Sequence, residues 1–153
     1  MLFIGQKFCI MGDWDDSSIP EGKIAILFPP TWPNESLFGL GWHPSTQSFA
    51  LKLEQAMKPG LSVLDFGTGS GILAIMAAKL GASEVVAVEN DTTAYEYAQR
   101  AFELNDVKVE LVEKVPQGQW DIVVANIGDA ALALNRALLR GALKDGGTPR
   151  WNL

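Results

Sequence analysis

The chain has 153 residues, of which 48% are hydrophobic and 20% are charged, a composition typical of one soluble globular domain. This composition excludes a disordered tail, a collagen-like chain and a small disulfide-stabilised protein. With 18 acidic and 12 basic side chains, the net charge is −6, which argues against an extensive nucleic-acid surface because phosphates would be repelled.

The first 38 residues predict a small β appendage. Apolar stretches of strand length occupy Leu2–Ile4, Phe8–Met11 and Ile24–Phe28. Prolines at positions 29, 30 and 33 then prevent regular structure. We therefore expect an appendage and linker over residues 1–38 and a core domain over residues 39–153.

From Pro44 onward, helical and strand-like patterns alternate. The predicted helices run from Pro44 to the Pro59-Gly60 stop, over Ile72–Leu80, from Thr93 past Phe102, and from Asp129 to near Leu143. The predicted strands cover Leu61–Phe66, Val85–Val88, Val107–Val112 and Trp120–Ala125. Charges interrupt the third of these strands, which places it nearer an edge of the sheet.

Local signals mark the ends of the helices. Thr93–Glu96 has the form of a capping box, and Asp91 just before it suits a helix cap. Asp129 can cap the last helix, which Gly146-Gly147 stops. The residues after this glycine pair make a poor strand.

Strands and helices in this alternation predict an α/β fold. Unbroken apolar strands suit an open, mostly parallel, Rossmann-like sheet with helices on both faces. Ligands of such sheets bind outside the carboxyl ends of the strands. Residues 65–71, 89–91 and 125–127 should therefore surround one crevice.

A glycine-rich loop, Asp65–Gly71, follows the first strand of this core and opens a helix. Glycines at 67, 69 and 71 let the backbone turn sharply toward a ligand that the free N–H groups of the helix would face. A tight turn without a ligand is the alternative interpretation. Ile72 occupies the place of the third glycine of a dinucleotide fingerprint, and neither the Walker sequence nor the serine-hydrolase elbow is present.

Two polar residues end neighbouring strands. Glu89, about 20 residues after the glycine loop, can accept both hydroxyls of a ribose, whereas the alternative is a strand-end carboxylate that faces water. Asn126 offers an amide with donors and an acceptor, which could fix a ligand or an incoming amine. Its alternative role is to satisfy its own turn.

The segment Gly39–Thr46 precedes the first helix of the core and suits a lid. Its glycines stand next to a tryptophan, His43 and two hydroxyl side chains. The alternatives are a structural role for His43 and helix capping by Thr46.

Together these residues resemble the class I S-adenosylmethionine-dependent methyltransferases, and among them the PrmA family, which methylates amino groups of a large-subunit ribosomal protein. The lid segment, Val63–Ile75 and Val123–Ile127 carry the resemblance. It implies cofactor contacts at Thr46, Gly67, Glu89 and Asn126, with Asp65 and Gly69 in the same glycine motif. Leu40 and Ser45 depart from the threonines of the family's lid, and Glu89 replaces its usual aspartate.

The resemblance also sets expectations at the two ends of the chain. The family has a substrate-recognition domain ahead of this segment and further strands after Gly146-Gly147, so this chain resembles a truncated member. We expect the C-terminal strands to be missing. The Trp120–Ala125 strand would then expose an edge through which two copies can pair as a homodimer.

The function that we predict is S-adenosylmethionine-dependent methylation of protein amino groups, with a ribosomal protein as substrate. Asn126 would orient the amine and His43 would relay its proton. The alternatives are a cofactor-binding relic without catalysis and, less favoured by Ile72, a nicotinamide dinucleotide-binding domain.

Other features set the expected environment of the protein. The single Cys9 cannot form an internal disulfide, which favours a reducing, cytoplasmic location. One Cys and one His cannot build the usual zinc site, so we expect no metal. We expect no direct nucleic-acid contact and, without a long apolar stretch, no membrane span.

Overall fold

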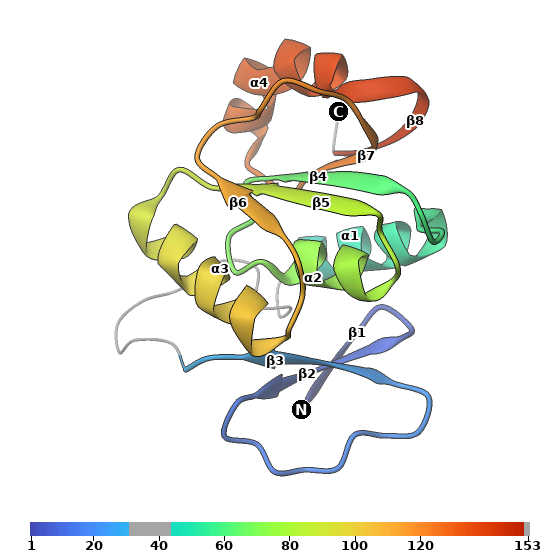
Figure 1. Cartoon of the computed structure of the whole chain (residues 1–153), viewed down its shortest axis with the longest axis vertical. Coiled ribbons are helices and arrows are strands. Elements are labelled where there is room, and N and C mark those ends of the chain that lie inside the picture. Colours follow the sequence, from blue (N-terminus) through green and yellow to red (C-terminus); the bar gives the residue numbers. More distant parts are fainter. Residues whose placement is uncertain (31–43, 152–153) are drawn as a thin grey trace.

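A parallel five-stranded sheet forms the centre of the fold (Figure 1). The computed structural model describes residues 1–30 and 44–151. The strands are β4 (Ser62–Phe66), β5 (Glu84–Val88), β6 (Glu110–Val112), β7 (Trp120–Ala125) and β8 (Leu143–Trp151). They lie in the order β6-β5-β4-β7-β8, and every neighbouring pair is parallel. The expected Rossmann-like α/β fold is confirmed.

Helices cover both faces of this sheet (Figure 1). On one face lie α1 (Pro44–Ala56), α2 (Ile72–Lys79) and α3 (Thr92–Leu104), and on the other lies α4 (Asp129–Ala142). Alternate strand residues serve the two layers: Val63 packs in the core of α1–α3, and Leu64 packs in the core under α4. In the described part of the chain, no helix is long and apolar enough to cross a membrane.

A second, three-stranded sheet lies on the outer side of α1–α3 (Figure 1). Its strands are β1 (Leu2–Ile4), β2 (Phe8–Gly12) and β3 (Ile24–Phe28), as expected from their apolar patterns. β2 pairs antiparallel with β1 and parallel with β3. Phe8, Ile10 and Ile26 join the same apolar core as α1–α3. The boundary near residue 38 lies outside the described residues, and the division into domains stays a prediction.

The helix caps differ from two of the sequence expectations. Asp91 caps α3, because its carboxylate accepts from the backbone N–H of Ala94 at 2.9 Å. The helix thus starts at Thr92, and the capping box predicted from Thr93 is wrong. Gly128 is the N-cap of α4, so Asp129 is its first residue, where an acidic side chain favours the helix dipole.

The C-terminal residues form a strand that the sequence did not predict. β8 pairs with β7 from Ile122↔Thr148 to Ala125↔Trp151. Gly146, with φ of 75°, lies within the irregular part of β8 rather than at the end of a helix. Pro149 is tolerated because an edge strand directs only alternate N–H groups toward the sheet.

This strand corrects the expectation that nothing follows β7. Both sides of β7 are occupied, by β4 and by β8. The predicted homodimer required an open edge on β7, so the structure removes the reason for it.

Candidate functional site

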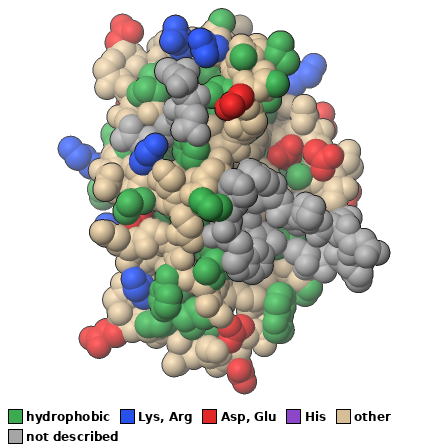
Figure 2. Space-filling model, turned by 180° about the vertical axis from the view of Figure 1, so that it is seen from behind, with side chains coloured by type: hydrophobic (Ala, Val, Ile, Leu, Met, Phe, Trp, Pro, Cys, Tyr) green, Lys and Arg blue, Asp and Glu red, His purple; other side chains and the backbone are tan. Residues whose placement is uncertain are grey.

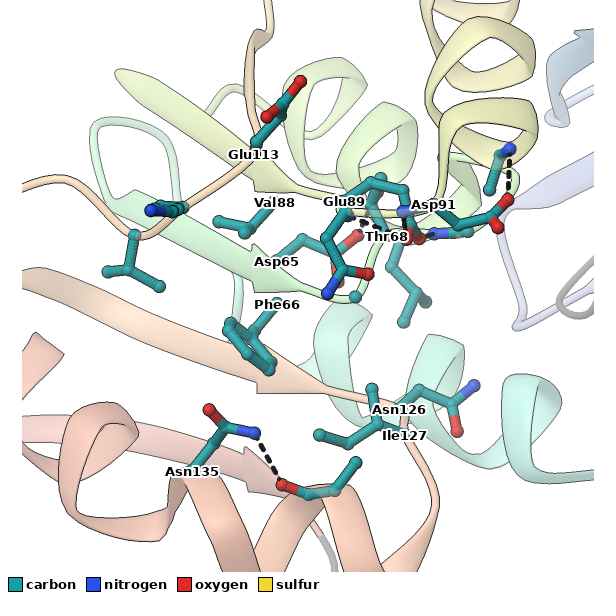
Figure 3. Close-up of a pocket in the computed structure, with 18 of the residues that line it drawn as sticks. Asp65, Phe66, Thr68, Val88, Glu89, Asp91, Glu113, Asn126, Ile127 and Asn135 are labelled. Carbon is teal, nitrogen blue, oxygen red and sulfur yellow. Dashed lines mark hydrogen bonds between the residues drawn. The ribbon is translucent and has the colours of Figure 1, made fainter.

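A cleft of about 930 Å³ opens at the carboxyl ends of β4, β5, β6 and β7 (Figure 3). Its volume lies in the range of about 300–1,000 Å³ that is usual for small-molecule sites. The loops after these strands and one side of α4 line it. Among the lining residues are Asp65, Phe66, Gly67, Thr68, Gly69, Val88, Glu89, Asp91, Glu113, Lys114, Val115, Asn126, Ile127, Ala131, Asn135 and Leu138.

The glycine loop between β4 and α2 forms one wall of the cleft. Gly67, Gly69 and Gly71 have φ angles of 74°, 58° and 88°, a left-handed conformation that residues other than glycine rarely adopt. A Cβ on Gly67 would lie 2.5 Å from the Ile127 side chain, and one on Gly71 would lie 2.7 Å from the ring of Phe102. The loop therefore needs its glycines both for its backbone angles and for space.

Glu89 fixes this loop from the end of β5. Its Oε1 accepts from Gly69 N at 2.9 Å, and its Oε2 accepts from Asn90 N and Asp91 N at 3.0 and 3.1 Å. A carboxylate has about four acceptor sites, so three backbone bonds leave one site for a ligand. To accept both hydroxyls of a ribose, as the sequence led us to expect, Glu89 would have to give up one of its hydrogen bonds to the backbone. With all three bonds kept, it can accept one hydroxyl.

Asp65, at the end of β4, is a buried acid, with 2% of its surface exposed. The hydroxyl of Thr68 donates to its Oδ2 at 2.7 Å. Loss of hydration raises the pKa of Asp65 to about 6, with a smaller push from the negative charge of Glu89; the Thr68 hydrogen bond acts in the opposite direction. Protonation of Asp65 therefore changes within the physiological pH range.

Asn126 follows β7 and connects the cleft to α1. Its Nδ2 donates to Thr46 Oγ1 at 3.3 Å. Thr46 is fully buried in the first turn of α1, behind the lining residues. Pro44 begins this helix, so Thr46 is not the helix cap. Among the described residues, none donates a hydrogen bond to the amide oxygen of Asn126.

The structure brings most of the predicted site residues together. Asp65, Gly67, Gly69, Glu89 and Asn126 line the cleft. Thr46 instead supports Asn126 from α1. His43 and the rest of the predicted lid before Pro44 lie outside the described residues. The roles of these residues stay predictions.

Two parts of the lining were missed by the sequence reasoning. Glu113, Lys114 and Val115 follow β6, and the rule that ligands bind at the carboxyl ends of strands could have found them. The contribution of α4, through Asn135 and Leu138, had no signal, because it depends on how the helix crosses the sheet.

Charge around the cleft favours a ligand with a positive group. The described lining residues include four acids, Asp65, Glu89, Asp91 and Glu113, against a single cation, Lys114. On the face of the molecule that Figure 2 shows, lysine and arginine side chains are scattered among apolar and acidic ones. Among the described residues, no cluster of His, Cys, Asp or Glu could hold a metal ion.

The cleft combines three chemical features. Apolar side chains, including Phe66, Val88 and Ile127, provide surfaces for a flat ring. Glu89 offers a carboxylate for a hydroxyl, and the surrounding acids suit a cation. S-adenosylmethionine has all three groups, namely adenine, ribose and a sulfonium, so the residues present fit this cofactor.

Comparisons with known proteins agree with this fit. The model of the family described as ribosomal protein L11 methyltransferase (PrmA) matches residues 2–149. The ribosomal protein L11 methyltransferase of Burkholderia lata is 42% identical over 146 residues, which cover 94% of this chain and 47% of that protein. The enzyme of the same name from Burkholderia vietnamiensis gives the same values. The chain thus spans about half the length of the curated relatives it matches.

Solved structures give the same result at the level of the fold. A ribosomal protein L11 methylase from Lactobacillus delbrueckii subsp. bulgaricus superposes with a TM-score of 0.82 at 30% identity, covering 95% of this chain and 74% of that one. A 16S rRNA methyltransferase from T. thermophilus, solved with AdoMet and guanosine, gives a TM-score of 0.53 at 29% identity. The latter match covers 60% of this chain and 28% of the other.

Proposed function

Because this chain belongs to the ribosomal protein L11 methyltransferase (PrmA) family, we propose that it binds S-adenosylmethionine and methylates amino groups of a ribosomal protein. The observation that carries this proposal is the glycine loop fixed by Glu89 at the edge of the 930 Å³ cleft. The location that we propose is the cytoplasm, where such a substrate is made.

The cofactor would be held by backbone and side chains at the carboxyl ends of β4, β5 and β7. Gly67 and Gly69 allow it to approach the main chain closely. The remaining acceptor site of Glu89 would take one ribose hydroxyl, and Phe66 and Ile127 would contact the adenine. When bound, the cofactor supplies an electrophilic methyl group on a sulfonium.

The residues of the chain would position the acceptor amine. A lysine amine has a pKa of about 10.4, so it must lose a proton before it can attack. The amide oxygen of Asn126 can accept an N–H of that amine, because Thr46 already holds the other end of the amide. His43 remains our candidate for the proton relay. Holding the amine in line for attack could supply about 7–11 kcal/mol of the barrier reduction in a favourable case.

Binding is the first test. We expect titration calorimetry to show heat with S-adenosylmethionine and none with NAD. Glu89→Gln loses an acceptor for the loop and the sugar, which should weaken binding about tenfold or more. Glu84→Gln is the matched control, since Glu84 is an exposed glutamate at the other end of the same strand. Binding of NAD, or equal affinities in the two variants, would overturn the assignment.

Catalysis is tested separately with a cofactor that carries a radiolabelled methyl group. Purified L11-type ribosomal protein should become labelled, and Asn126→Ala should reduce the rate at least tenfold even when the cofactor saturates its site. Full transfer by Asn126→Ala would remove that residue from the mechanism. Cofactor binding without transfer to any ribosomal protein would instead show the non-catalytic relic.

A further inference from the structure

The turn between β1 and β2 holds a carboxylate from a distant helix. Glu54, in the last turns of α1, accepts from the backbone N–H of Gln6 at 2.8 Å and of Lys7 at 2.9 Å. Each of its two oxygens takes one bond. We call this arrangement, made by Gly5, Gln6, Lys7 and Glu54, the hairpin clasp.

The clasp is shaped for this side chain. Gly5 has φ of 59°, and a Cβ there would collide with the Glu54 carboxylate. Lys23 Nζ donates to Gln6 O at 2.5 Å, which brings a positive charge to the turn. Glu54 is only 9% exposed, so its charge depends on these partners for stabilisation. An apolar residue in this place would leave the N–H groups of Gln6 and Lys7 without their acceptor, so the carboxylate makes a directional contact that an apolar side chain cannot replace.

Helix α1 connects the clasp to the cleft. Thr46 lies eight residues before Glu54 in the same helix, which is about 12 Å along its axis. The clasp therefore holds the C-terminal end of α1, and Thr46 near the N-terminal end of the same helix contacts Asn126. A small shift or rotation of the helix would move Thr46 relative to Asn126, where the hydrogen bond is already long at 3.3 Å.

We propose that Glu54 is a positioning residue for the cofactor site, acting through α1 and Thr46 on the amide of Asn126. This inference rests on the proposed function for its effect on methyl transfer. Its structural core, that the hairpin clasp sets the orientation of Asn126, does not need the cofactor. In this proposal the small N-terminal sheet helps to orient Asn126, although none of the sheet's described residues lines the cleft.

The experiment compares Glu54→Gln with a matched control. Glutamine has nearly the same shape, but its NH2 group would face one of the two backbone N–H donors. The control is Asp121→Asn, which weakens another carboxylate that accepts from a backbone N–H, that of Ser62, at the far end of the sheet. Both variants should lower Tm by similar amounts. A merely structural role would thus affect both alike.

Two readouts then separate positioning from stability. In the chain without cofactor, the side-chain amide signal of Asn126 in an NMR spectrum should shift in Glu54→Gln and stay in place in Asp121→Asn. Well below Tm, Glu54→Gln should also bind S-adenosylmethionine about tenfold more weakly. In a Thr46→Val background, the same substitution should have little further effect on affinity, because the path through Thr46 is already broken.

The possible outcomes decide between the two ideas. An unmoved Asn126 signal together with unchanged affinity in Glu54→Gln overturns the positioning role and leaves the proposed function intact. If the Asn126 signal shifts in Glu54→Gln but the wild-type chain binds no cofactor, the positioning role stands and the proposed function is overturned. If Glu54→Gln does not fold, hydrogen exchange of the wild type serves instead. If the amides of α1 exchange more slowly than those of Gln6 and Lys7, the helix stays folded when the clasp opens, which contradicts the proposal. If both sets of amides exchange at the same rate, clasp and helix open together, which supports it.

Discussion

The two ends of the central sheet use aspartate in opposite ways. At the carboxyl end, Asp65 is buried, and loss of hydration raises its pKa to about 6. At the amino end, Asp121 accepts from the N–H and the hydroxyl of Ser62, both at 2.9 Å, and these bonds lower its pKa. One carboxylate is destabilised by its surroundings and the other is stabilised.

The difference favours the carboxyl end of the sheet as the place for a ligand. At the amino end, Ser62 and Asp121 satisfy each other, and Lys144 adds a contact at 3.5 Å. At the carboxyl end, acidic side chains lie around an open cleft, and loss of hydration raises the pKa of the buried Asp65. Unfavourable negative charge at this end of the sheet therefore marks the site that a ligand would complete.

The largest expected loss of stability comes from substituting a glycine of the carboxyl end, with a glycine of the amino end as the comparison. Gly71→Ala combines a left-handed φ of 88° with a collision against Phe102, so we expect a loss of about 2–4 kcal/mol in unfolding free energy. Gly60→Ala, before β4, has φ of 93° but open space around it, and should lose only about 1 kcal/mol. Urea titration of both variants measures the difference. Equal losses would show that the Phe102 contact does not constrain the loop.

The next effect is a pH dependence that Asp65 imposes on stability. Its pKa is about 6 in the fold against an ordinary aspartate value of 3.8, so the ionised form opposes folding. This cost is absent below the lower pKa, grows as the pH rises, and reaches at most about 3 kcal/mol above the higher one. In Asp65→Asn, the unfolding free energy should fall less between about pH 4 and pH 7. Parallel pH profiles for the variant and the wild type would refute the raised pKa.

Asp121 should show the opposite sign. Because its pKa is lowered in the fold, its contribution is present at neutral pH and disappears as the pH falls through the folded pKa. Asp121→Ala should lose about 1–2 kcal/mol at pH 7, in line with two hydrogen bonds. The free energies of variant and wild type should converge in acid. A gap that stays constant down to low pH would mean that packing, rather than charge, explains the loss.

The smallest effect is expected for the ion pair at the same end. Lys144 and Asp121 are partly exposed, at 47% and 30%, and the nitrogen lies 3.5 Å from the carboxylate. Lys144→Ala should change stability by less than about 1 kcal/mol, and added salt should reduce this difference further. A loss that persists in high salt would instead indicate that Lys144 holds β8 by packing its aliphatic part.

The sequence predicted the elements whose patterns are local. β7 and β3 were predicted with their observed bounds, Trp120–Ala125 and Ile24–Phe28, because short apolar runs between polar loops allow little alternative. β8 was missed because Gly146, Gly147 and Pro149 oppose a strand by propensity. Pairing with the edge of β7 overrides that propensity, and such long-range pairing leaves no local signal.

The candidate site was predictable to the same degree. Asp65, Glu89 and Asn126 end parallel strands, so topology alone brings them together. The contact between Thr46 and Asn126 joins residues 80 positions apart and depends on how α1 packs. The two carboxylate oxygens of Glu89 accept hydrogen bonds from three backbone N–H groups. These bonds depend on the folded shape of the loop, so the residue type alone could not predict them.

The attachment of the small sheet has a consequence for anyone who divides this chain. In addition to Glu54, two residues of α3 and its end hold the small sheet. The side-chain amide of Asn105 accepts from the backbone N–H of Leu27 at 2.8 Å and donates to the Leu27 carbonyl at 2.7 Å. The hydroxyl of Tyr97 donates to Pro29 O at 2.9 Å. Phe8 and Ile26 lie in the same core as the helices. A recombinant piece that starts after residue 38 would present the bare undersides of α1–α3 to water, so we expect it to aggregate unless the first thirty residues are supplied in trans.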